Sequence, residues 1–329
     1  MVSGIMVNLQ SSHIDYDAVA YRTGVILVED PGWPASPPWE FSSDAQKYDI
    51  SRFGLANSKD SPSILSQDKV NRFFCTSFIY PDDYHTRAIF GDNPYRFNIS
   101  VRDEETGQNQ SVGDVLPDGY GYIRRLVKIK SSSNASIGSS YFVNHKYNNT
   151  GVPSDFNVSR HEFSILINNT RLQTEQKNPA YQIDPVREQI MINITDLQST
   201  IFPVPPTVAS DVKIKLDSIK VYKTEGGILS LVRTFDTPYI DGSSTASPPP
   251  VIVKDNISLI INPRVFDIMQ AGYSKVYINL TFDMLDSGGA PVKSSFLNNT
   301  LTTPFDYNYN AANVTQPRLK DAVVEVAVW

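Results

Sequence analysis

The chain of 329 residues carries a net charge of −6, because 35 Asp and Glu residues outnumber 29 Lys and Arg residues. This acidic balance argues against nucleic acid as a partner, and a hydrophobic content of 40% argues against a disordered chain. No run of apolar residues reaches the ~20 that a membrane span needs, and no complete signal peptide is visible. The abundance of Tyr, Phe, Pro and Asn favours strands and loops over helices.

Residues 1–30 contain an apolar stripe at steps of three and four residues, which is typical of one face of an amphipathic helix. Pro31 should end this helix, because the residue before a proline is pushed out of the α region. Apolar residues further upstream indicate the tail of a longer hydrophobic helix, whose earlier part would hold an export signal. The alternative is an ordinary amphipathic helix docked on the domain. The predicted packing stripe is Ile14, Ala18, Tyr21, Val25 and Val28.

Residues 31–90 are predicted to form a Pro- and Ser-rich loop followed by a short helix. Ser66 is a suitable N-cap for a helix that runs from Gln67 to about Ser77. Cys75 would lie within this helix as a small core residue. The buried side of the helix would consist of Val70, Phe73 and Phe74.

From residue 91 to 329, apolar and polar residues alternate in short segments, which is the pattern of half-buried strands. A phase slip near Asp217 and Ser218 predicts a β-bulge, and residues 225–227 predict a hairpin turn. The predicted fold is therefore mainly β, with an N-terminal α-helix followed by an antiparallel β-sandwich head. Two proline runs would divide this head near 202–250 if it has two halves. The clearest predicted strands are 95–101, 123–129, 163–167, 190–194, 212–221, 276–284 and 322–328.

Eleven Asn-X-Ser/Thr sequons occur in a chain that has a single cysteine. Roughly four would arise by chance in this composition, and sequons mark surface positions of exported proteins. Export without paired cysteines favours an archaeal cell-surface protein, although a chain that is merely rich in Asn, Ser and Thr is the alternative. The strand pattern places Asn98, Asn193 and Asn279 on polar faces. The candidate glycosylation sites are Asn98, Asn109, Asn134, Asn148, Asn157, Asn168, Asn193, Asn256, Asn279, Asn298 and Asn313.

Residues 18–34 read AVAYRTGVILVEDPGWP and are followed by WEF and by ISRFGLANSKDSPSILSQDKVNRFF. Together with PYRFNISVRDEETG, GYGYIRRLVKIK and the final VAVW, these segments resemble archaeal type IV pilin-like surface proteins. The resemblance is strongest over residues 18–130 and over the last ten residues. It implies a class III signal and an apolar helix ahead of a β-rich extracellular head.

The residue types that carry chemistry in enzymes form no catalytic motif in this sequence. None of the four histidines belongs to an HExxH motif, and neither a Gly-rich phosphate loop nor a GxSxG elbow occurs. Cys75 lacks the local signature of a nucleophile. The acidic segment at residues 80–85 could bind Ca²⁺, but a solvated turn is the favoured interpretation. We therefore expect no enzymatic activity, no cofactor and no metal site.

Three functions remain as hypotheses at this stage. The favoured one is a structural cell-surface protein, a pilin-like or filament-associated minor subunit that is anchored to a membrane or to other pilin-like subunits through its N-terminal helix. The alternative is a surface adhesion module that binds carbohydrate or a partner cell through aromatic loop residues such as Tyr307 and Tyr309. A secreted hydrolase would need two carboxylates facing one cleft, which a sequence cannot reveal.

Overall fold

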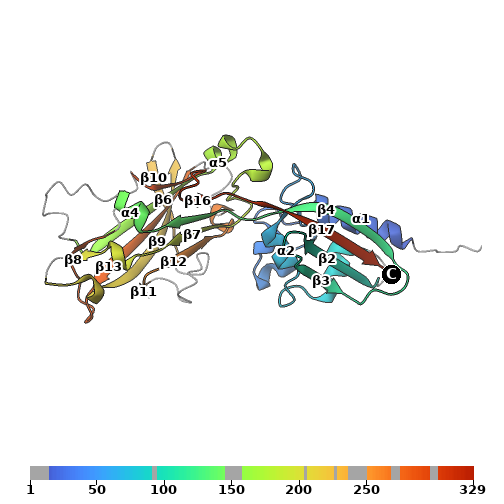
Figure 1. The fold of residues 1–329 in the computed structure, drawn as a ribbon, viewed down its shortest axis with the longest axis horizontal. Coiled ribbons are helices and arrows are strands. Elements are labelled where there is room, and N and C mark those ends of the chain that lie inside the picture. Colours follow the sequence, from blue (N-terminus) through green and yellow to red (C-terminus); the bar gives the residue numbers. More distant parts are fainter. Residues whose placement is uncertain are drawn as a thin grey trace, which may run out of the picture.

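The computed structural model describes residues 15–90, 95–144, 158–203, 206–225, 228–235, 250–267, 275–296 and 303–329. Within these residues the chain is mainly β, and the expected N-terminal helix is present. Figure 1 shows an elongated molecule with two lobes, of which one contains helix α1. Two long strands, β4 (Gly121–Lys130) and β17 (Leu319–Val328), reach from this lobe towards the other.

Each lobe has a hydrophobic core of its own. One core contains buried residues from 20–129 and 322–328, and the other contains buried residues from 135–314. The chain therefore crosses between the lobes twice, at 131–133 and at 316–318. Residues 15–130 and 319–329 are named the α1 domain, and residues 131–318 the inserted domain.

This division differs from the predicted one near 202–250. Ile201, Val212 and Val253 flank the two proline runs, and all three belong to the core of the inserted domain. Residues 204–205 and 247–249 of those runs lie outside the described residues. Proline favours extended backbone, which suits a connection inside a domain as well as one between domains. The cores instead separate where the paired strands β4 and β17 end.

The α1 domain is a sheet with strand order β1-β4-β17-β2-β3, against which helix α1 packs through contacts with β4 and β17. Its remaining strands are β1 (Ile64–Ser66), β2 (Phe97–Asp103) and β3 (Asn109–Gly113). Its helical elements are α1 (Tyr16–Glu29), η1 (Trp39–Phe41), η2 (Asp44–Asp49), α2 (Gln67–Phe73), α3 (Pro81–Tyr84) and the π-helical turn η3 (His85–Ile89).

The inserted domain contains a sheet with strand order β10-β9-β13-β6-β15, to which β11 adds through β9, and a second sheet with strand order β12-β7-β5-β16. A short pair, β14 with β8, stands apart. The strands are β5 (Asn134–Ile137), β6 (Arg160–Asn168), β7 (Ile190–Ile194), β8 (Phe202–Pro203), β9 (Lys213–Glu225), β10 (Ile228–Phe235), β11 (Val251–Val253), β12 (Ile257–Ile261), β13 (Lys275–Leu285), β14 (Ser294–Ser295), β15 (Phe305–Tyr307) and β16 (Val314–Thr315). The helical elements are α4 (Ser139–Asn144), α5 (Asn169–Glu175), η5 (Pro179–Tyr181), η6 (Gln198–Thr200), η7 (Ala209–Asp211) and α6 (Arg264–Asp267).

The sequence predicted antiparallel sheets, but each of the three larger sheets is mixed. Strand β1 pairs in parallel with β4, β5 with β7, and β15 with β6. Side chains alternate between the two faces of a strand whichever way its neighbour runs. The hydrophobic pattern therefore located the strands but contained no information on their direction.

The β-bulge and the hairpin of the inserted domain are confirmed. The register of β13 against β9 shifts between Leu216 and Ser218, so that Asp217 forms the predicted bulge. Strands β9 and β10 pair from Glu225 and Ile228 onwards, while the turn residues 226–227 lie outside the described residues.

The short helix is confirmed at its start but not at its end. Ser66 is its N-cap, and the Ser66 hydroxyl accepts a hydrogen bond from the backbone N of Lys69. Helix α2 ends at Phe73, about one turn earlier than predicted. Cys75 consequently lies beyond the helix and is half-buried, not a core residue within the helix.

Helix α1 begins and ends through ordinary capping chemistry. The Asp15 carboxylate accepts a hydrogen bond of 3.0 Å from the backbone N of Ala18. Asp17 adds a negative charge to the first turn, where the helix dipole is positive. The helix ends at Glu29, and Asp30 is extended ahead of Pro31 as the sequence predicted.

The face of α1 that packs on the sheet is not the predicted stripe. Of that stripe, Val28 is buried and Val25 half-buried, but Ala18 and Tyr21 are exposed. Ile14 lies outside the described residues. The buried residues of α1 are Ala20, Thr23, Gly24, Leu27 and Val28.

Small residues explain this difference. The spacing of the buried residues is helical, but Thr23 is polar and Gly24 has no side chain, so a search for apolar residues overlooks them. A Cβ atom on Gly24 would lie 2.8 Å from Cγ2 of Ile123 on β4. The helix therefore approaches the sheet through the residues that let its backbone come closest.

Gly121 provides a test of how tightly α1 is seated on the sheet. A Cβ atom at Gly121 would lie 2.1 Å from the backbone C of Tyr16 and 2.5 Å from the backbone N of Asp17. We expect Gly121→Ala to lower the free energy of unfolding of the α1 domain by about 1–3 kcal/mol, because the helix start must move away. Gly119→Ala is the matched control, since no atom lies within 4 Å of a Cβ at that position. Urea unfolding followed by circular dichroism would measure both, and equal stability of the two variants would contradict the close seating.

Candidate functional site

The outward face of α1 is the first candidate surface. Tyr21 is 55% exposed, and Ala18 and Val25 lie on the same side of the helix. These residues belong to the predicted packing stripe, so α1 has an apolar stripe on each of two faces. One stripe is used by the α1 domain itself, and the other faces away from it.

Two arginines hold α1 in this orientation. The Arg22 guanidinium donates a hydrogen bond of 2.8 Å to the backbone O of Ile89 and another to that of Phe90. Arg125, which interrupts the apolar face of β4, reaches the Glu29 carboxylate at the end of the helix. With the helix held in this orientation, Ala18 and Tyr21 are exposed and Val25 is half-buried.

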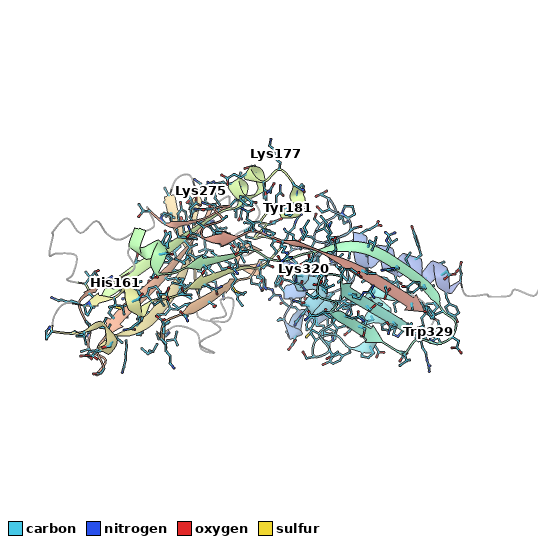
Figure 2. The ribbon with its side chains drawn as sticks, viewed as in Figure 1. His161, Lys177, Tyr181, Lys275, Lys320 and Trp329 are labelled. Carbon is cyan, nitrogen blue, oxygen red and sulfur yellow. The ribbon has the colours of Figure 1, made fainter. Side chains whose placement is uncertain are left out.

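The direction of α1 places its first turn at one end of the molecule. Asp17 accepts a hydrogen bond of 3.1 Å from the backbone N of Tyr122, near the start of β4. At the other end of the helix, the backbone O of Val28 accepts a hydrogen bond from the backbone N of Ser63, which lies beside the end of β4. Figure 2 shows Trp329 at the end of the molecule away from the inserted domain. The first turn of α1 therefore lies at that end.

None of the described helices combines the length and the apolar character that crossing a bilayer requires. Residues 1–14 lie outside the described residues.

The sequons are spread unevenly over the two domains. Asn98 and Asn109 lie in the α1 domain, and the other nine belong to the inserted domain. Asn148, Asn157 and Asn298 lie outside the described residues. The asparagines that are exposed or half-buried are Asn98, Asn109, Asn134, Asn168, Asn193, Asn256 and Asn313.

Asn279 is the exception, because it lies in the middle of the central strand β13 and is 2% exposed. Its side-chain O accepts a hydrogen bond of 2.7 Å from the Ser164 hydroxyl. The strand pattern correctly put Asn279 on the polar face of β13, but at this position the side chain is buried. A glycan cannot be buried, so the prediction of a glycosylation site at Asn279 is wrong for the folded chain.

The junction between the domains is the second candidate site. Lys130, the last residue of β4, forms an ion pair of 2.8 Å with Glu188, and both side chains are almost completely buried. The Lys130 ammonium also donates a hydrogen bond of 2.6 Å to the backbone O of Gln182. Glu188 accepts a further hydrogen bond from the backbone N of Asp184. Figure 2 shows Lys320 and Tyr181 on either side of this junction.

A second carboxylate, that of the half-buried Asp68, lies at the same junction. Asp68 of α2 accepts hydrogen bonds of 3.0 Å each from the Ser132 hydroxyl and the Gln189 side-chain amide. The two crossing segments also bond to each other, because Ser131 and Arg318 exchange hydrogen bonds between backbone and side-chain atoms. Polar contacts therefore join the two domains at a place where neither hydrophobic core is continuous.

Burial controls the ionisation of both carboxylates. It raises the pKa of Glu188 to about 7, although the charge of the Lys130 ammonium lowers it in part. Burial also raises the pKa of Asp68, which the hydrogen bonds from Ser132 and Gln189 partly offset. The junction is consequently sensitive to pH near neutrality through Glu188.

The acidic segment and Cys75 make structural contacts. Asp83, in the acidic segment, forms ion pairs of 2.6 Å with Lys47 and with Arg87. The thiol of Cys75 contacts the Ser77 hydroxyl at 3.1 Å. In the described ranges, no three metal-ligating side chains gather at one place.

Glu40 and Lys69 are a further pair of buried titratable groups. Burial raises the pKa of Glu40 to about 7 and lowers the pKa of Lys69. The Lys69 ammonium donates hydrogen bonds to the backbone O atoms of Pro31 and Ala56, so it holds the loop after α1 in place. Glu40 makes no side-chain hydrogen bond within the described part of the chain.

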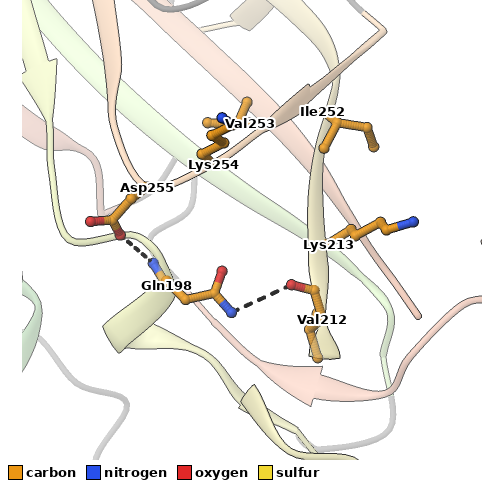
Figure 3. Close-up of a pocket in the computed structure, with 7 residues that line it drawn as sticks. All are labelled: Gln198, Val212, Lys213, Ile252, Val253, Lys254 and Asp255. Carbon is orange, nitrogen blue, oxygen red and sulfur yellow. Dashed lines mark hydrogen bonds between the residues drawn. The ribbon is translucent and has the colours of Figure 1, made fainter. Parts of the chain in front are cut away.

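A depression of about 340 Å³ lies on the inserted domain, next to β11 (Figure 3). Two of the polar groups around it bond to their neighbours, because Gln198 donates from its backbone N to Asp255 and from its side chain to the backbone O of Val212. One carboxylate and two lysines line it, which does not match the acid pair of a glycosidase. The lining residues are Gln198, Val212, Lys213, Ile252, Val253, Lys254 and Asp255.

The tyrosines expected in a recognition loop are structural. Tyr307 is 1% exposed, and its hydroxyl contacts that of Ser133 at 2.7 Å. The hydroxyl of Tyr309 accepts from the backbone N of Ile183 and donates to the backbone O of Leu172. These two side chains therefore fasten the inserted domain near its junction and are not available to a ligand.

Comparisons with protein-family models, with curated proteins and with solved structures found no match to the chain.

The junction was not predicted, because its residues look ordinary in the sequence. Lys130 follows the alternating segment of β4 and reads as the polar residue that ends a strand. Glu188 lies in a loop, where a solvated carboxylate is the usual interpretation. The burial of Lys130 and Glu188 follows from the crossing of the chain between two domains, which the sequence does not reveal.

The ion pair at the junction can be tested with two lysines of the same strand. We expect Lys130→Met to lower the free energy of unfolding by about 3–5 kcal/mol at pH 8, because the buried Glu188 loses its partner and must either stay ionised and unpaired or take up a proton from a basic solution. Lys128→Met is the matched control. Lys128 pairs with Asp321 in an exposed position, where we expect little or no loss, because water screens the pair. The double variant Lys130→Met with Glu188→Leu should recover most of the loss.

The loss from Lys130→Met should also depend on pH. The folded pKa of Glu188, about 7, lies above its ordinary value of 4.5, so the folded chain holds this proton more tightly than the unfolded chain. The stabilisation that this proton provides is fully present below pH 4.5 and is lost as the pH rises through about 7. Lys130→Met should therefore be much less harmful at pH 5, where Glu188 is protonated, than at pH 8. Urea unfolding at both values would measure this, and an equal loss at both would contradict the buried ion pair.

Proposed function

We propose that this protein is a non-enzymatic structural protein of an archaeal cell surface, a pilin-like or filament-associated minor subunit. The observation that carries the proposal is the second apolar stripe of α1, which faces away from the domain that holds the helix. A helix that uses small residues to seat itself and leaves Tyr21 exposed is suited to contact a further helix or a membrane. The partners would be the apolar helices of other pilin-like subunits or the membrane.

The distribution of sequons supports this orientation. Nine of the eleven belong to the inserted domain, and two belong to the α1 domain. Glycans are bulky and hydrophilic, so they suit the part of a subunit that faces the outside. The inserted domain would be a glycosylated extracellular β-sandwich head, whose two larger sheets share one core.

The anchor in this proposal is an apolar helix that precedes α1 in the native chain and is separate from it, because Asp15 is the non-helical N-cap of α1. The first turn of α1 lies at the end of the molecule away from the inserted domain, so such a helix would leave the head without crossing it. Assembly would then bury the Ala18, Tyr21 and Val25 stripe between subunits, while the inserted domain stays outside.

A charge placed on the outer stripe of α1 tests the proposal. We expect the variant Ala18→Asp with Tyr21→Asp to fold as the parent does but to be lost from surface filaments or from the membrane fraction, because a charge cannot be buried between apolar helices without a partner. The amount of the variant in sheared filaments and membranes, against total protein in the source cells, is the measurement.

Tyr48→Asp is the matched control, because Tyr48 is 85% exposed on the same domain but lies outside α1. Normal recovery of the α1 variant in filaments or membranes would contradict the proposal. Mass spectrometry of the native protein should in addition find an N-terminus upstream of Met1 within an apolar segment, and glycan mass on the chain. An unmodified protein without such a segment would remove both supports.

A further inference from the structure

The sheet formed by β12, β7, β5 and β16 has one face packed into the core of the inserted domain. Every second residue of these strands points inward and is buried. The inward residues are Ala135, Ile137, Ile190, Ile192, Ile194, Ile257, Leu259, Ile261 and Val314. The residues between them must point to the opposite face, because side chains alternate along a strand.

That opposite face carries one sequon on each of its four strands. A sequon places its Asn and its Ser or Thr two residues apart, so in a strand both side chains lie on the same face. The pairing brings the sequons of neighbouring strands together, because Asn193 lies opposite both Ser136 and Ser258, and Thr315 lies opposite Asn134. The four sequons are Asn134–Ser136 within β5, Asn193–Thr195 at the end of β7, Asn256–Ser258 at the start of β12 and Asn313–Thr315 at the start of β16, and Thr195, Asn256 and Asn313 lie just outside the strands.

The acceptor amides on this face are accessible. Asn256 is exposed, and the asparagines of the other three strands are half-buried. The side-chain O of Asn193 accepts a hydrogen bond of 2.7 Å from the Ser258 hydroxyl. That bond uses the oxygen of the amide and not the nitrogen to which a glycan would be attached.

The face has a further unusual property, since none of its outward strand residues is charged. Met191 and Ile260 are half-exposed there, among Asn, Ser and Thr side chains. The larger sheet of the same domain differs, because Arg160 and Lys215 on its outer face form ion pairs with Asp217 and Asp283. An open sheet face without charges is prone to association, so something other than charge must keep this face apart from its neighbours.

We propose that this face is covered by N-linked glycans on its four sequon asparagines, Asn134, Asn193, Asn256 and Asn313. The inference rests on the proposed surface location, which would expose the chain to the glycosylation machinery. The first sugars would lie over Met191 and Ile260, and the glycan layer would exclude this face from contacts between subunits. The charged face of the larger sheet and the outer stripe of α1 then remain for such contacts.

The chemistry at each site is a substitution at the anomeric carbon of a sugar. The side-chain N of Asn forms a bond to that carbon, and the bond from the carbon to the phosphate of a lipid-linked glycosyl phosphate breaks. The amide loses one proton to a base of the transferring enzyme, the phosphate leaves with its electron pair, and nothing is oxidised or reduced. The modified amide keeps one N–H.

Site mapping of the native protein by glycopeptide mass spectrometry tests the proposal. We expect glycans on at least three of the four asparagines of this face, and none on Asn279, which is buried in the folded chain. Glycans on Asn98, Asn109 or Asn168 with two or fewer on this face would overturn the inference while leaving a surface glycoprotein. No glycan on any sequon would overturn both the inference and its support in the proposed function.

Removal of the glycans tests the covering role. In a host that glycosylates the chain, the four-site variant Ser136→Ala, Thr195→Ala, Ser258→Ala and Thr315→Ala removes the sequons and retains every asparagine, including the Asn that Ser258 contacts. A second variant with Asn→Gln at the four acceptors keeps the hydroxyls, and so guards against a folding defect of the first. We expect both to fold but to self-associate in sedimentation, because the face loses its cover.

The matched control removes the sequons of Asn98, Asn109 and Asn168 by the same Ser or Thr to Ala change, away from this face. It should lose a comparable glycan mass and stay monomeric. If the four-site variants also stay monomeric, the covering role is wrong. If the control self-associates equally, the effect is one of general solubility and the assignment to this face fails.

Discussion

The pairing of β4 with β17 is the constraint on which the rest of the molecule depends. The two strands pair over ten positions, from Leu319 opposite Lys130 to Val328 opposite Gly121. Strand β4 ends where the chain leaves for the inserted domain, and β17 begins where the chain returns from it. The inserted domain therefore has two connections that are bonded to each other. Helix α1 packs on the same two strands. A single ladder thus fixes the helix, the junction and the direction in which the inserted domain extends.

The polar character of the junction has consequences that an apolar junction would not have. Apolar surfaces can slide over one another at little cost, whereas separating Lys130 from Glu188 would leave a charge buried without a partner. The geometry of the pair therefore favours one arrangement of the domains, although removing two charges from water costs free energy. The raised pKa of Glu188 shows that this compensation is incomplete. Acid weakens the ion pair by protonating the carboxylate, and in the same step it removes the buried negative charge.

The sequence predicted those features that local chemistry determines. The strands, the bulge at Asp217 and the cap at Ser66 were all correct, because alternation and capping involve neighbours in the sequence. Strand direction, the place where the cores divide and the burial of Asn279 depend on segments far apart in the chain. The stripe on α1 was a correct apolar pattern assigned to the wrong partner, because seating on the sheet depends on Gly24 and not on the larger residues.

These misassigned features share a physical explanation that bears on function. A residue pattern indicates that a surface is apolar or polar, but not which neighbour packs against it. In the folded chain some of these surfaces are covered by other parts of the same chain, and others are exposed. The Asn279 side chain on β13 is buried within its own domain, whereas the polar face of the β12-β7-β5-β16 sheet and the apolar stripe of α1 are open. The two open surfaces lie on different domains and differ in chemistry, one apolar and one rich in sequons. A subunit with this polarity would bury the first in an assembly and keep the second in water, because exchanging the two would place glycans between helices and expose the stripe.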